Sequence, residues 1–202
     1  MGERSVDDRY RTGRLVLRDG AGEVEAEGFA GELAWPRLEE YPAVPEELQP
    51  REVTWGIGPN AVMHYIEDVI SGYCWVTFSG FNPETLLDIR EAAILALPVR
   101  TEDEIISGYD RATTPDALVS ATYLAGIAAP ESFEERFFQR VERSLASGAT
   151  QVRQAALWAT TYSAWPEFRP ALALIAHHDP DPARRQDAAF VLEAFDAVEG
   201  QQ

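Results

Sequence analysis

Histidine and cysteine, the side chains best suited to catalysis or metal binding near neutral pH, are scarce in this chain. It has three histidines and one cysteine among 202 residues. His177 and His178 precede Asp179, and imidazole and carboxylate groups can ligate zinc or share a proton. Adjacent residues of a helix point about 100° apart, so the two imidazoles do not readily face one ion. The pair is therefore predicted to end a helix and compensate its dipole, and no metal or other cofactor is expected.

The only cysteine, Cys74, is a poor candidate for a nucleophile. It lies between Tyr73 and Trp75 in a predicted strand, whereas a reactive thiol needs an exposed, electropositive setting and a nearby base. A single cysteine also excludes an intrachain disulfide and a cysteine-based zinc site. Glycine-rich phosphate loops and nucleophile elbows are absent as well. We therefore predict that the chain is not an enzyme.

The charge of the chain is strongly negative. It has 34 acidic and 17 basic residues, all 17 of them arginine, for a net charge of -17. This balance disfavours nucleic acid and anionic membranes, which need a positive footprint, and favours a basic protein partner. The charged N-terminus and the absence of an apolar run of about 18 residues predict neither a secretion signal nor a membrane span. We therefore expect a cytoplasmic protein, and the lack of lysine suggests a GC-rich bacterial genome.

The first part of the chain, residues 1–81, has the sequence pattern of a small β-rich unit. Alternation over 14–18, a glycine-containing turn and the segment 24–29 predict two paired strands. Five prolines between 36 and 59 predict an irregular connection, with a short strand at 53–57. Aromatic and β-branched residues over 62–69 and 73–78 predict the clearest hairpin.

From residue 82 onward, the pattern indicates helices. Asn82 followed by Pro83 and Glu84 is a typical helix start, and similar starts recur near residues 101, 114, 130, 166 and 181. Apolar residues follow each start at spacings of three and four. Residues 82–202 are therefore expected to form about seven helices of roughly 8 to 17 residues.

An alanine-rich helical segment recurs through this second part. Its four copies are 92–96, 121–125, 155–159 and 188–192, at spacings of 29, 34 and 33 residues. Each interval holds a second helix, so the repeating unit is a helix pair. Such a pair cannot bury its apolar side alone, and small residues on one stripe let the next pair approach closely. The repeat predicts a short curved stack of about four helix pairs.

The repeated segment resembles the HEAT-repeat α-solenoid family over roughly residues 83–198. Residues 152–157, Val-Arg-Gln-Ala-Ala-Leu, resemble the family's inner-helix pattern, and 179–182, Asp-Pro-Asp-Pro, resemble its turn into that helix. Trp165-Pro166-Glu167 stands where the turn within the array falls. In the last copy the alanines come one residue late and Arg184 replaces the usual valine, as in a terminal capping repeat. The resemblance implies protein binding far more often than catalysis.

Together these patterns predict an α+β protein of two domains. A β-rich unit with hairpins, residues 1–81, would cap one end of a short HEAT-like stack, residues 82–202.

Three aromatic residues are candidates for binding a partner. Trp158, Tyr162 and Trp165 are spaced by four and three residues, which places them on or near one face at the end of a predicted inner helix. Such a face belongs either to the core of the stack or to its concave surface, where aromatic residues act as anchors. Both alternatives stay open at this point.

Arg153 in one repeat and Arg184 or Arg185 in the next are expected to project from equivalent places. Arg153, Arg184 and Arg185 are therefore candidates for partner contacts. An ion pair with Asp179 or Asp181 within the stack is the simpler interpretation and the one that we favour.

We therefore expect a non-catalytic protein-binding module that uses the concave face of the stack and the hairpin at 62–79. Its narrower form is an acidic inhibitor or immunity-type protein that neutralises a basic partner, such as a toxin nuclease. One alternative is a scaffold or adaptor of a bacterial multiprotein system. Another is a small-ligand-binding protein or enzyme with a pocket between the β-rich unit and the stack, lined by His64, Tyr65 and Trp75.

Overall fold

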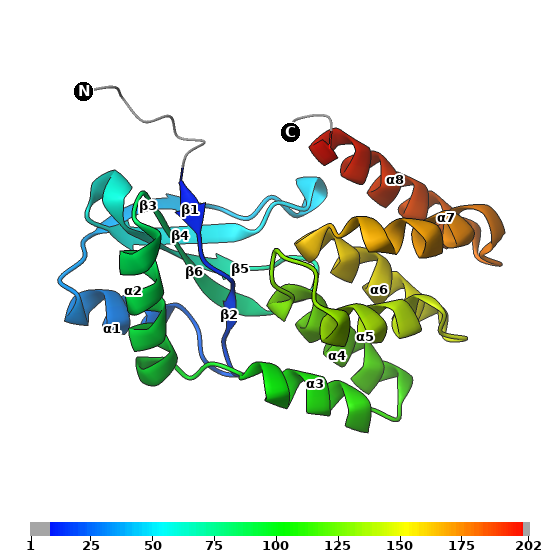
Figure 1. Cartoon of the computed structure of the whole chain (residues 1–202), viewed down its shortest axis with the longest axis horizontal. Helices are drawn as coiled ribbons and strands as arrows, with labels where there is room; N and C mark the ends of the chain where they lie inside the picture. The colour runs from blue at the N-terminus through cyan, green and yellow to red at the C-terminus, as the bar shows by residue number, and fades with distance from the viewer. Residues whose placement is uncertain (1–8, 200–202) are drawn as a thin grey trace. The chain divides into compact units, whose positions relative to one another are not determined.

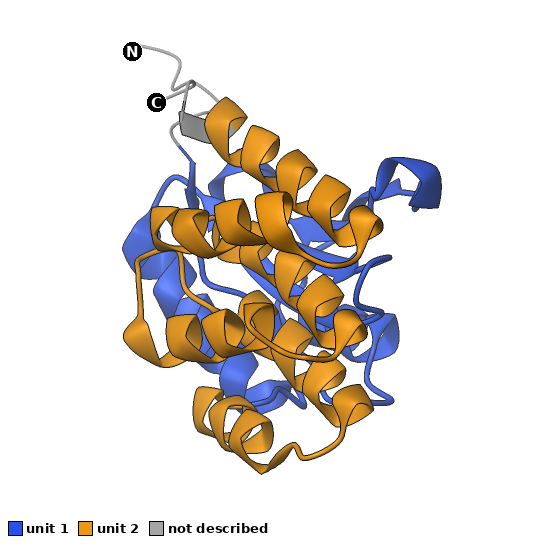
Figure 2. Ribbon diagram, turned by 90° about the vertical axis from the view of Figure 1, so that its right-hand side faces the viewer, with its two compact units in different colours: residues 1–100 blue, residues 101–202 orange. Residues whose placement is uncertain are grey.

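The computed structural model describes residues 9–199 and divides the chain into two compact units, residues 1–100 and residues 101–202 (Figures 1 and 2). It confirms an α+β fold with an antiparallel sheet followed by a helical stack. The boundary lies after Arg100 and not at residue 81, because helix α2 (Pro83–Ala96) packs on the sheet. Its Leu86 and Ala93 belong to the hydrophobic core of the first unit.

The sheet of the first unit has six antiparallel strands in its described part. They are β1 (Tyr10–Arg11), β2 (Leu15–Val16), β3 (Arg37–Tyr41), β4 (Arg51–Gly56), β5 (Val62–Glu67) and β6 (Cys74–Gly80), in the order β1-β6-β5-β4-β3, with β2 also paired to β6. The predicted hairpin is confirmed as β5 and β6, and the strand predicted at 53–57 as part of β4.

Strand β3 lies in the segment that was predicted to be irregular. All five of its residues are exposed, and its pairing with β4 contains a register shift between Arg37 and Glu40. An exposed edge strand has no buried face, so its sequence lacks the apolar alternation by which strands are predicted.

Residues 24–29 form part of a helix, so the prediction of a strand there was wrong. Helix α1 (Glu23–Glu32) buries Ala26, Phe29 and Ala30, at the i, i+3, i+4 spacing of one helix face. The Glu25 carboxylate accepts a 2.7 Å hydrogen bond from the Gly22 backbone N–H and so closes the first turn. This capping and the burial of Phe29 on the sheet determine the helical state.

The two faces of the sheet differ in character. One face contributes large apolar side chains to a core that α1 and α2 complete (Val53, Trp55, Met63, Tyr65, Val76 and Phe78). By strand alternation and register, the opposite face carries a row of polar side chains (Glu52, Thr54, His64, Thr77 and Ser79).

The second unit is a stack of helices. They are α3 (Glu102–Arg111), α4 (Pro115–Ala128), α5 (Glu135–Leu145), α6 (Thr150–Ser163), α7 (Arg169–His178) and α8 (Pro182–Glu199), with a 3₁₀ turn η4 (Pro166–Phe168) before α7. Helices α4, α6 and α8 pack side by side in one layer, and α3, α5 and α7 in the other (Figure 1). With α2, they match the seven helices expected after residue 82 in the described part of the chain.

The described stack contains three helix pairs, because the first predicted repeat copy, 92–96, lies in α2 of the sheet unit. The alanines of the other copies are buried, with the exception of Ala189 on α8, which is exposed. Helices α4 and α6 approach closely at Gly126, where a methyl group would lie 2.6 Å from the carbonyl oxygen of Ala159 on α6. Small residues therefore set the spacing of this layer, as the repeat predicted.

Helix starts follow the predicted chemistry in most places. The side chains of Asn82, Thr101 and Thr114 each accept a hydrogen bond from a backbone N–H in the first turn of their helix. Helices α5 and α7 are exceptions, since they begin at Glu135 and Arg169 and not near residues 130 and 166, and neither has a side-chain cap. No helix among residues 9–199 is both long and apolar enough to cross a membrane.

Candidate functional site

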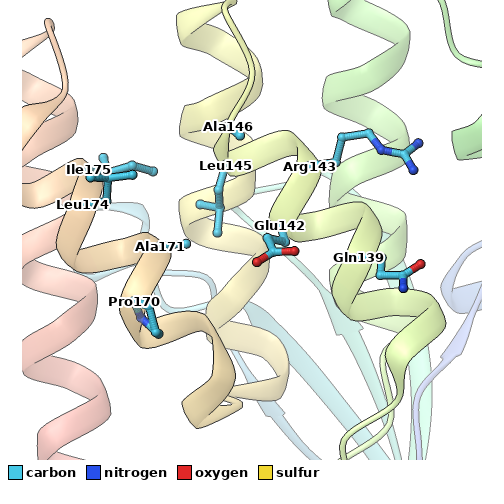
Figure 3. A pocket seen from close by; sticks show the side chains of 9 residues that line it. All are labelled: Gln139, Glu142, Arg143, Leu145, Ala146, Pro170, Ala171, Leu174 and Ile175. Atoms are coloured by element: carbon cyan, nitrogen blue, oxygen red, sulfur yellow. The ribbon is translucent and has the colours of Figure 1, made fainter.

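An open apolar groove runs between α5 and α7 of the helical unit (Figure 3). Its volume is about 590 Å³, and its lining is Gln139, Glu142, Arg143, Leu145, Ala146, Pro170, Ala171, Leu174 and Ile175. Leu174 leaves 63% of its surface exposed, which is high for a leucine on a packed helix. Glu142 at the rim is exposed and forms no ion pair with another residue of the described chain. The groove thus combines an apolar floor with an available negative charge.

A second hollow of about 320 Å³ extends this groove toward the end of α7. The two share four apolar residues (Leu145, Ala146, Leu174 and Ile175). The extension is also lined by His178 at the end of α7, by the following Asp179 and Pro180, and by Ser147 and Arg153. We call the combined surface the α5–α7 groove.

Arg153 and Asp179 form a buried ion pair at the end of the α5–α7 groove. The Arg153 Nε and Nη2 atoms donate to the two Asp179 carboxylate oxygens at 2.6 and 2.9 Å, and the side chains are 9% and 2% exposed. Arg153 Nη1 also donates to the carbonyl oxygens of Ser147 and Gly148. The hydrogen bond from Arg153 holds the pKa of Asp179 below its usual value. This is the ion pair favoured from the sequence.

Arg184 and Arg185 also make contacts within the stack. Arg184 is 9% exposed and lies 3.0 Å from an Asp187 carboxylate oxygen, while Arg185 donates to the Asp179 carbonyl oxygen at 2.6 Å. His177 and His178 are the last two residues of α7, as predicted. Nowhere among residues 9–199 do three metal-ligating side chains gather into a possible metal site.

The three aromatic candidates do not form one surface. Trp165 is 3% exposed, stacks on Phe168 and donates from its indole nitrogen to the Glu131 carbonyl oxygen at 3.0 Å. Trp158 and Tyr162 are half-buried on α6, and the Trp158 ring lies 6.2 Å from the ring of Phe190 on α8. Trp165 therefore belongs to the core, whereas Trp158 and Tyr162 lie in the α4, α6 and α8 layer, away from the α5–α7 groove.

Tyr65 and Trp75 are structural members of the sheet. Tyr65 is 1% exposed, and burial is the main reason why the pKa of its phenol is raised. Trp75 is 6% exposed, and the guanidinium of Arg14 lies over its ring at 5.9 Å. Cys74, half-buried beside them, has its pKa raised mainly by burial, the opposite of what a reactive thiol needs.

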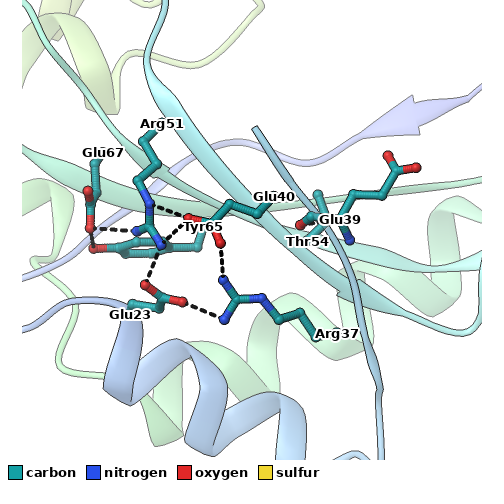
Figure 4. A network of polar contacts seen from close by, with 8 residues as sticks. All are labelled: Glu23, Arg37, Glu39, Glu40, Arg51, Thr54, Tyr65 and Glu67. Atoms are coloured by element: carbon teal, nitrogen blue, oxygen red, sulfur yellow. Dashed lines mark hydrogen bonds and ion pairs between the residues drawn. The ribbon is translucent and has the colours of Figure 1, made fainter. Parts of the chain in front are cut away.

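A network of ion pairs joins α1 to strands β3, β4 and β5 (Figure 4). Arg51 lies within 2.7 to 3.1 Å of carboxylate oxygens of Glu23, Glu40 and Glu67, and Arg37 binds Glu23 and Glu40. The hydrogen bond from Arg51 is the main reason why the pKa of Glu40 is lowered. The network pairs two arginines with three glutamates and ties the edge strand β3 to α1 and β4.

A cleft of about 760 Å³ opens on the polar face of the sheet, entirely within the first unit. It is lined by Arg9, Arg11, Arg37, Leu38, Glu39, Tyr41, Glu52, Thr54, Gly58, Pro59, Val62 and His64. His64 connects two further side chains, since its Nδ1 lies 2.5 Å from Glu52 Oε1 and its Nε2 lies 2.7 Å from Ser79 Oγ. Sequence reasoning missed Glu52 and Ser79. The available signal was the alternation that places them on the face of His64.

No protein-family model matches the chain, and no curated protein or solved structure matches it significantly.

Proposed function

We propose that the chain is a protein-binding module whose α5–α7 groove receives an apolar segment of a basic partner. The observation that carries the proposal is the exposed Leu174 on the floor of an apolar groove. Exposed apolar surface in a groove costs free energy in water, and a partner that covers it gains that free energy on binding.

The charge of the chain supports a basic partner. The net charge of -17 attracts a positively charged protein over a distance of several ångströms, and Glu142 at the groove rim can pair with a lysine or arginine. An apolar residue flanked by basic residues therefore suits the α5–α7 groove. An inhibitor or immunity-type protein that occupies a basic partner is the narrower function that we propose.

The groove lies in the α3, α5 and α7 layer, which differs from the location expected from the sequence. The aromatic candidates Trp158 and Tyr162 lie in the other layer, and the candidate arginines are engaged in contacts within the stack. The binding residues that we now propose are Leu145, Leu174 and Glu142.

A photo-crosslinking side chain at position 174 tests this function. Crosslinking in a lysate of the source cells should capture a basic protein, and a crosslinker at Leu95 of α2, which is 89% exposed, is the matched control. The captured protein is then purified and titrated against the Leu174→Arg and Leu95→Arg variants. We expect Leu174→Arg to weaken binding at least about 30-fold, as for an interface hot spot, and Leu95→Arg to leave it unchanged.

Salt dependence separates the basic-partner proposal from a scaffold function. Binding should weaken as NaCl is raised from 0.1 to 0.5 M, because salt screens exposed charges. Capture of an acidic partner would contradict the proposal. So would a partner that binds the wild type and the Leu174→Arg variant with the same affinity.

A further inference from the structure

Three side chains on the polar face of the sheet form a continuous hydrogen-bonded chain. Ser79 on β6, His64 on β5 and Glu52 on β4 come from three neighbouring strands. The distances are 2.7 Å from Ser79 Oγ to His64 Nε2 and 2.5 Å from His64 Nδ1 to Glu52 Oε1. A hydroxyl bonded to an imidazole whose other nitrogen is held by a carboxylate is the arrangement that activates a serine nucleophile.

The direction of these hydrogen bonds suits that chemistry. A hydrogen bond from His64 lowers the pKa of Glu52, so Glu52 is ionised and can only accept at neutral pH. In the neutral imidazole, Nδ1 therefore carries the proton that is donated to Glu52. The remaining nitrogen, Nε2, is then free to accept the proton of the Ser79 hydroxyl.

The chain of hydrogen bonds reaches the cleft on this face. His64 and Glu52 line the cleft, and their side chains are 13% and 26% exposed. Ser79 is 7% exposed and is paired in register with Val62 on one side and Arg11 on the other, both of which line the cleft. Ser79 thus lies between two residues of the cleft wall.

The cleft also offers positive charge. Arg9 and Arg11 lie two residues apart on one extended segment and so point to the same side of it. Within residues 9–199 neither of them forms an ion pair, and the buried Nε of Arg9 has no hydrogen-bond partner. The charge of Arg11 also acts on Glu52. Three arginines (Arg9, Arg11 and Arg37) line the cleft against two glutamates (Glu39 and Glu52), whereas acidic residues outnumber arginines two to one in the whole chain, so the cleft favours an anionic ligand.

We propose that this cleft hydrolyses small carboxylic esters that carry an acidic substituent, with Ser79 as nucleophile and His64 as general base. Glu52 is a positioning residue that orients His64 and stabilises its protonated form. Arg9 and Arg11 supply positive charge for the oxyanion and for the acidic substituent of the ester. This activity lies in the sheet unit and is independent of the protein-binding function proposed for the α5–α7 groove.

The reaction proceeds in two steps. Ser79 Oγ attacks the ester carbonyl carbon while its proton passes to His64 Nε2, and the ester C–O bond breaks as the leaving alcohol takes that proton. A water molecule then attacks the acyl-serine carbonyl carbon and gives its proton to His64 Nε2. Ser79 Oγ leaves and regains the proton, so the products are one carboxylic acid and one alcohol.

A fluorophosphonate probe, which reacts with activated serines, tests the nucleophile in the folded full-length chain. We expect mass spectrometry to locate the label on Ser79, and labelling to disappear in Ser79→Ala and in urea-unfolded wild type. Ser107→Ala is the matched control, because this serine bonds only a backbone oxygen of its own helix. An unlabelled Ser79 in the folded wild type overturns the proposal.

Further variants test the roles of the other residues without removing Ser79. His64→Gln should slow labelling about 100-fold or more, as expected when a general base is lost. Glu52→Gln should slow labelling at least about tenfold. The same substitution should shift the low-field proton resonance of His64 Nδ1–H, and a merely structural role of Glu52 would not couple that shift to the labelling rate. Circular dichroism confirms that each variant is folded. Equal labelling rates in folded wild type and His64→Gln refute the role of the imidazole.

Hydrolysis of two 4-nitrophenyl esters tests the class of substrate. The wild type should cleave the anionic hemisuccinate faster than the neutral acetate, and Arg9→Ala should reduce this preference at least about tenfold. The opposite preference, or a preference unchanged in Arg9→Ala, overturns the assignment of the arginines.

Discussion

Removing the carboxylate of Asp179 should destabilise the helical unit strongly. In wild type the Asp179 side chain is 2% exposed and binds two nitrogens of Arg153, and one of its oxygens also accepts from the Asp181 backbone N–H at 2.9 Å. In Asp179→Ala, the buried Arg153 guanidinium keeps its positive charge but loses the two carboxylate oxygens of Asp179. Breaking a buried pair in this way costs about 3–5 kcal/mol, because the remaining charge is left without compensation.

Thermal unfolding followed by circular dichroism measures this effect. For a chain of this length, a loss of about 3–5 kcal/mol lowers the melting temperature of the protein by roughly 6 to 20 °C. Asp196→Ala is the matched control, because Asp196 also binds an arginine at 2.7 Å but is 69% exposed. The control should cost only about 0–1 kcal/mol. Equal losses in the two variants would refute the argument from burial.

Two further predictions concern acid stability and helix packing. Since Arg153 lowers the pKa of folded Asp179, the contribution of the pair is complete above about pH 4, the pKa of an unfolded aspartate, and is lost as the pH falls through the lower folded pKa. The difference in unfolding free energy between wild type and Asp179→Asn, measured in urea, should therefore shrink below about pH 4, and a constant difference would contradict the assignment. Gly126→Ala should destabilise the protein by about 1–3 kcal/mol in urea unfolding, because the new methyl group meets Ala159 of α6. Gly108→Ala in α3, where the added methyl group meets no other atom within 4 Å, should instead stabilise it by about 0.4–1 kcal/mol, and a loss of equal size in both variants would show that packing is not the cause.

Features of the fold that depend on local chemistry could be predicted from the sequence. The caps at Asn82, Thr101 and Thr114 were found because the capping side chain and the backbone N–H that it binds lie within three residues of each other. Helix α1 was missed for the complementary reason. The six residues 24–29 fit either a strand or a helix, and the contacts that decide between them, those of Ala26 and Phe29 with the sheet, involve residues far along the chain.

The functional surfaces were less predictable than the fold. The Arg153–Asp179 pair could be expected because both residues belong to the repeated pattern. The α5–α7 groove gives no comparable signal, since Leu145 and Leu174 are ordinary apolar residues until two helices bring them together. The contacts among Ser79, His64 and Glu52 depend on the registers of three strands, and register is a property of the folded sheet.

The placement of individual charges is more informative than the net charge of -17. Arg51 and Arg37 bind several glutamates each, and Arg136 lies within 3.3 Å of carboxylate oxygens of three acidic residues, so these three arginines engage six acidic residues in local networks. Residues that stay outside such networks are therefore the ones available for function. Glu142 in the described helical stack and the Arg9–Arg11 pair in the sheet are such residues. Glu142 lines the α5–α7 groove, and Arg9 and Arg11 line the cleft of the sheet unit. The two proposals, a basic partner for one unit and an anionic ester for the other, are therefore compatible in one chain, because a ligand responds to the local field of each site and not to the net charge.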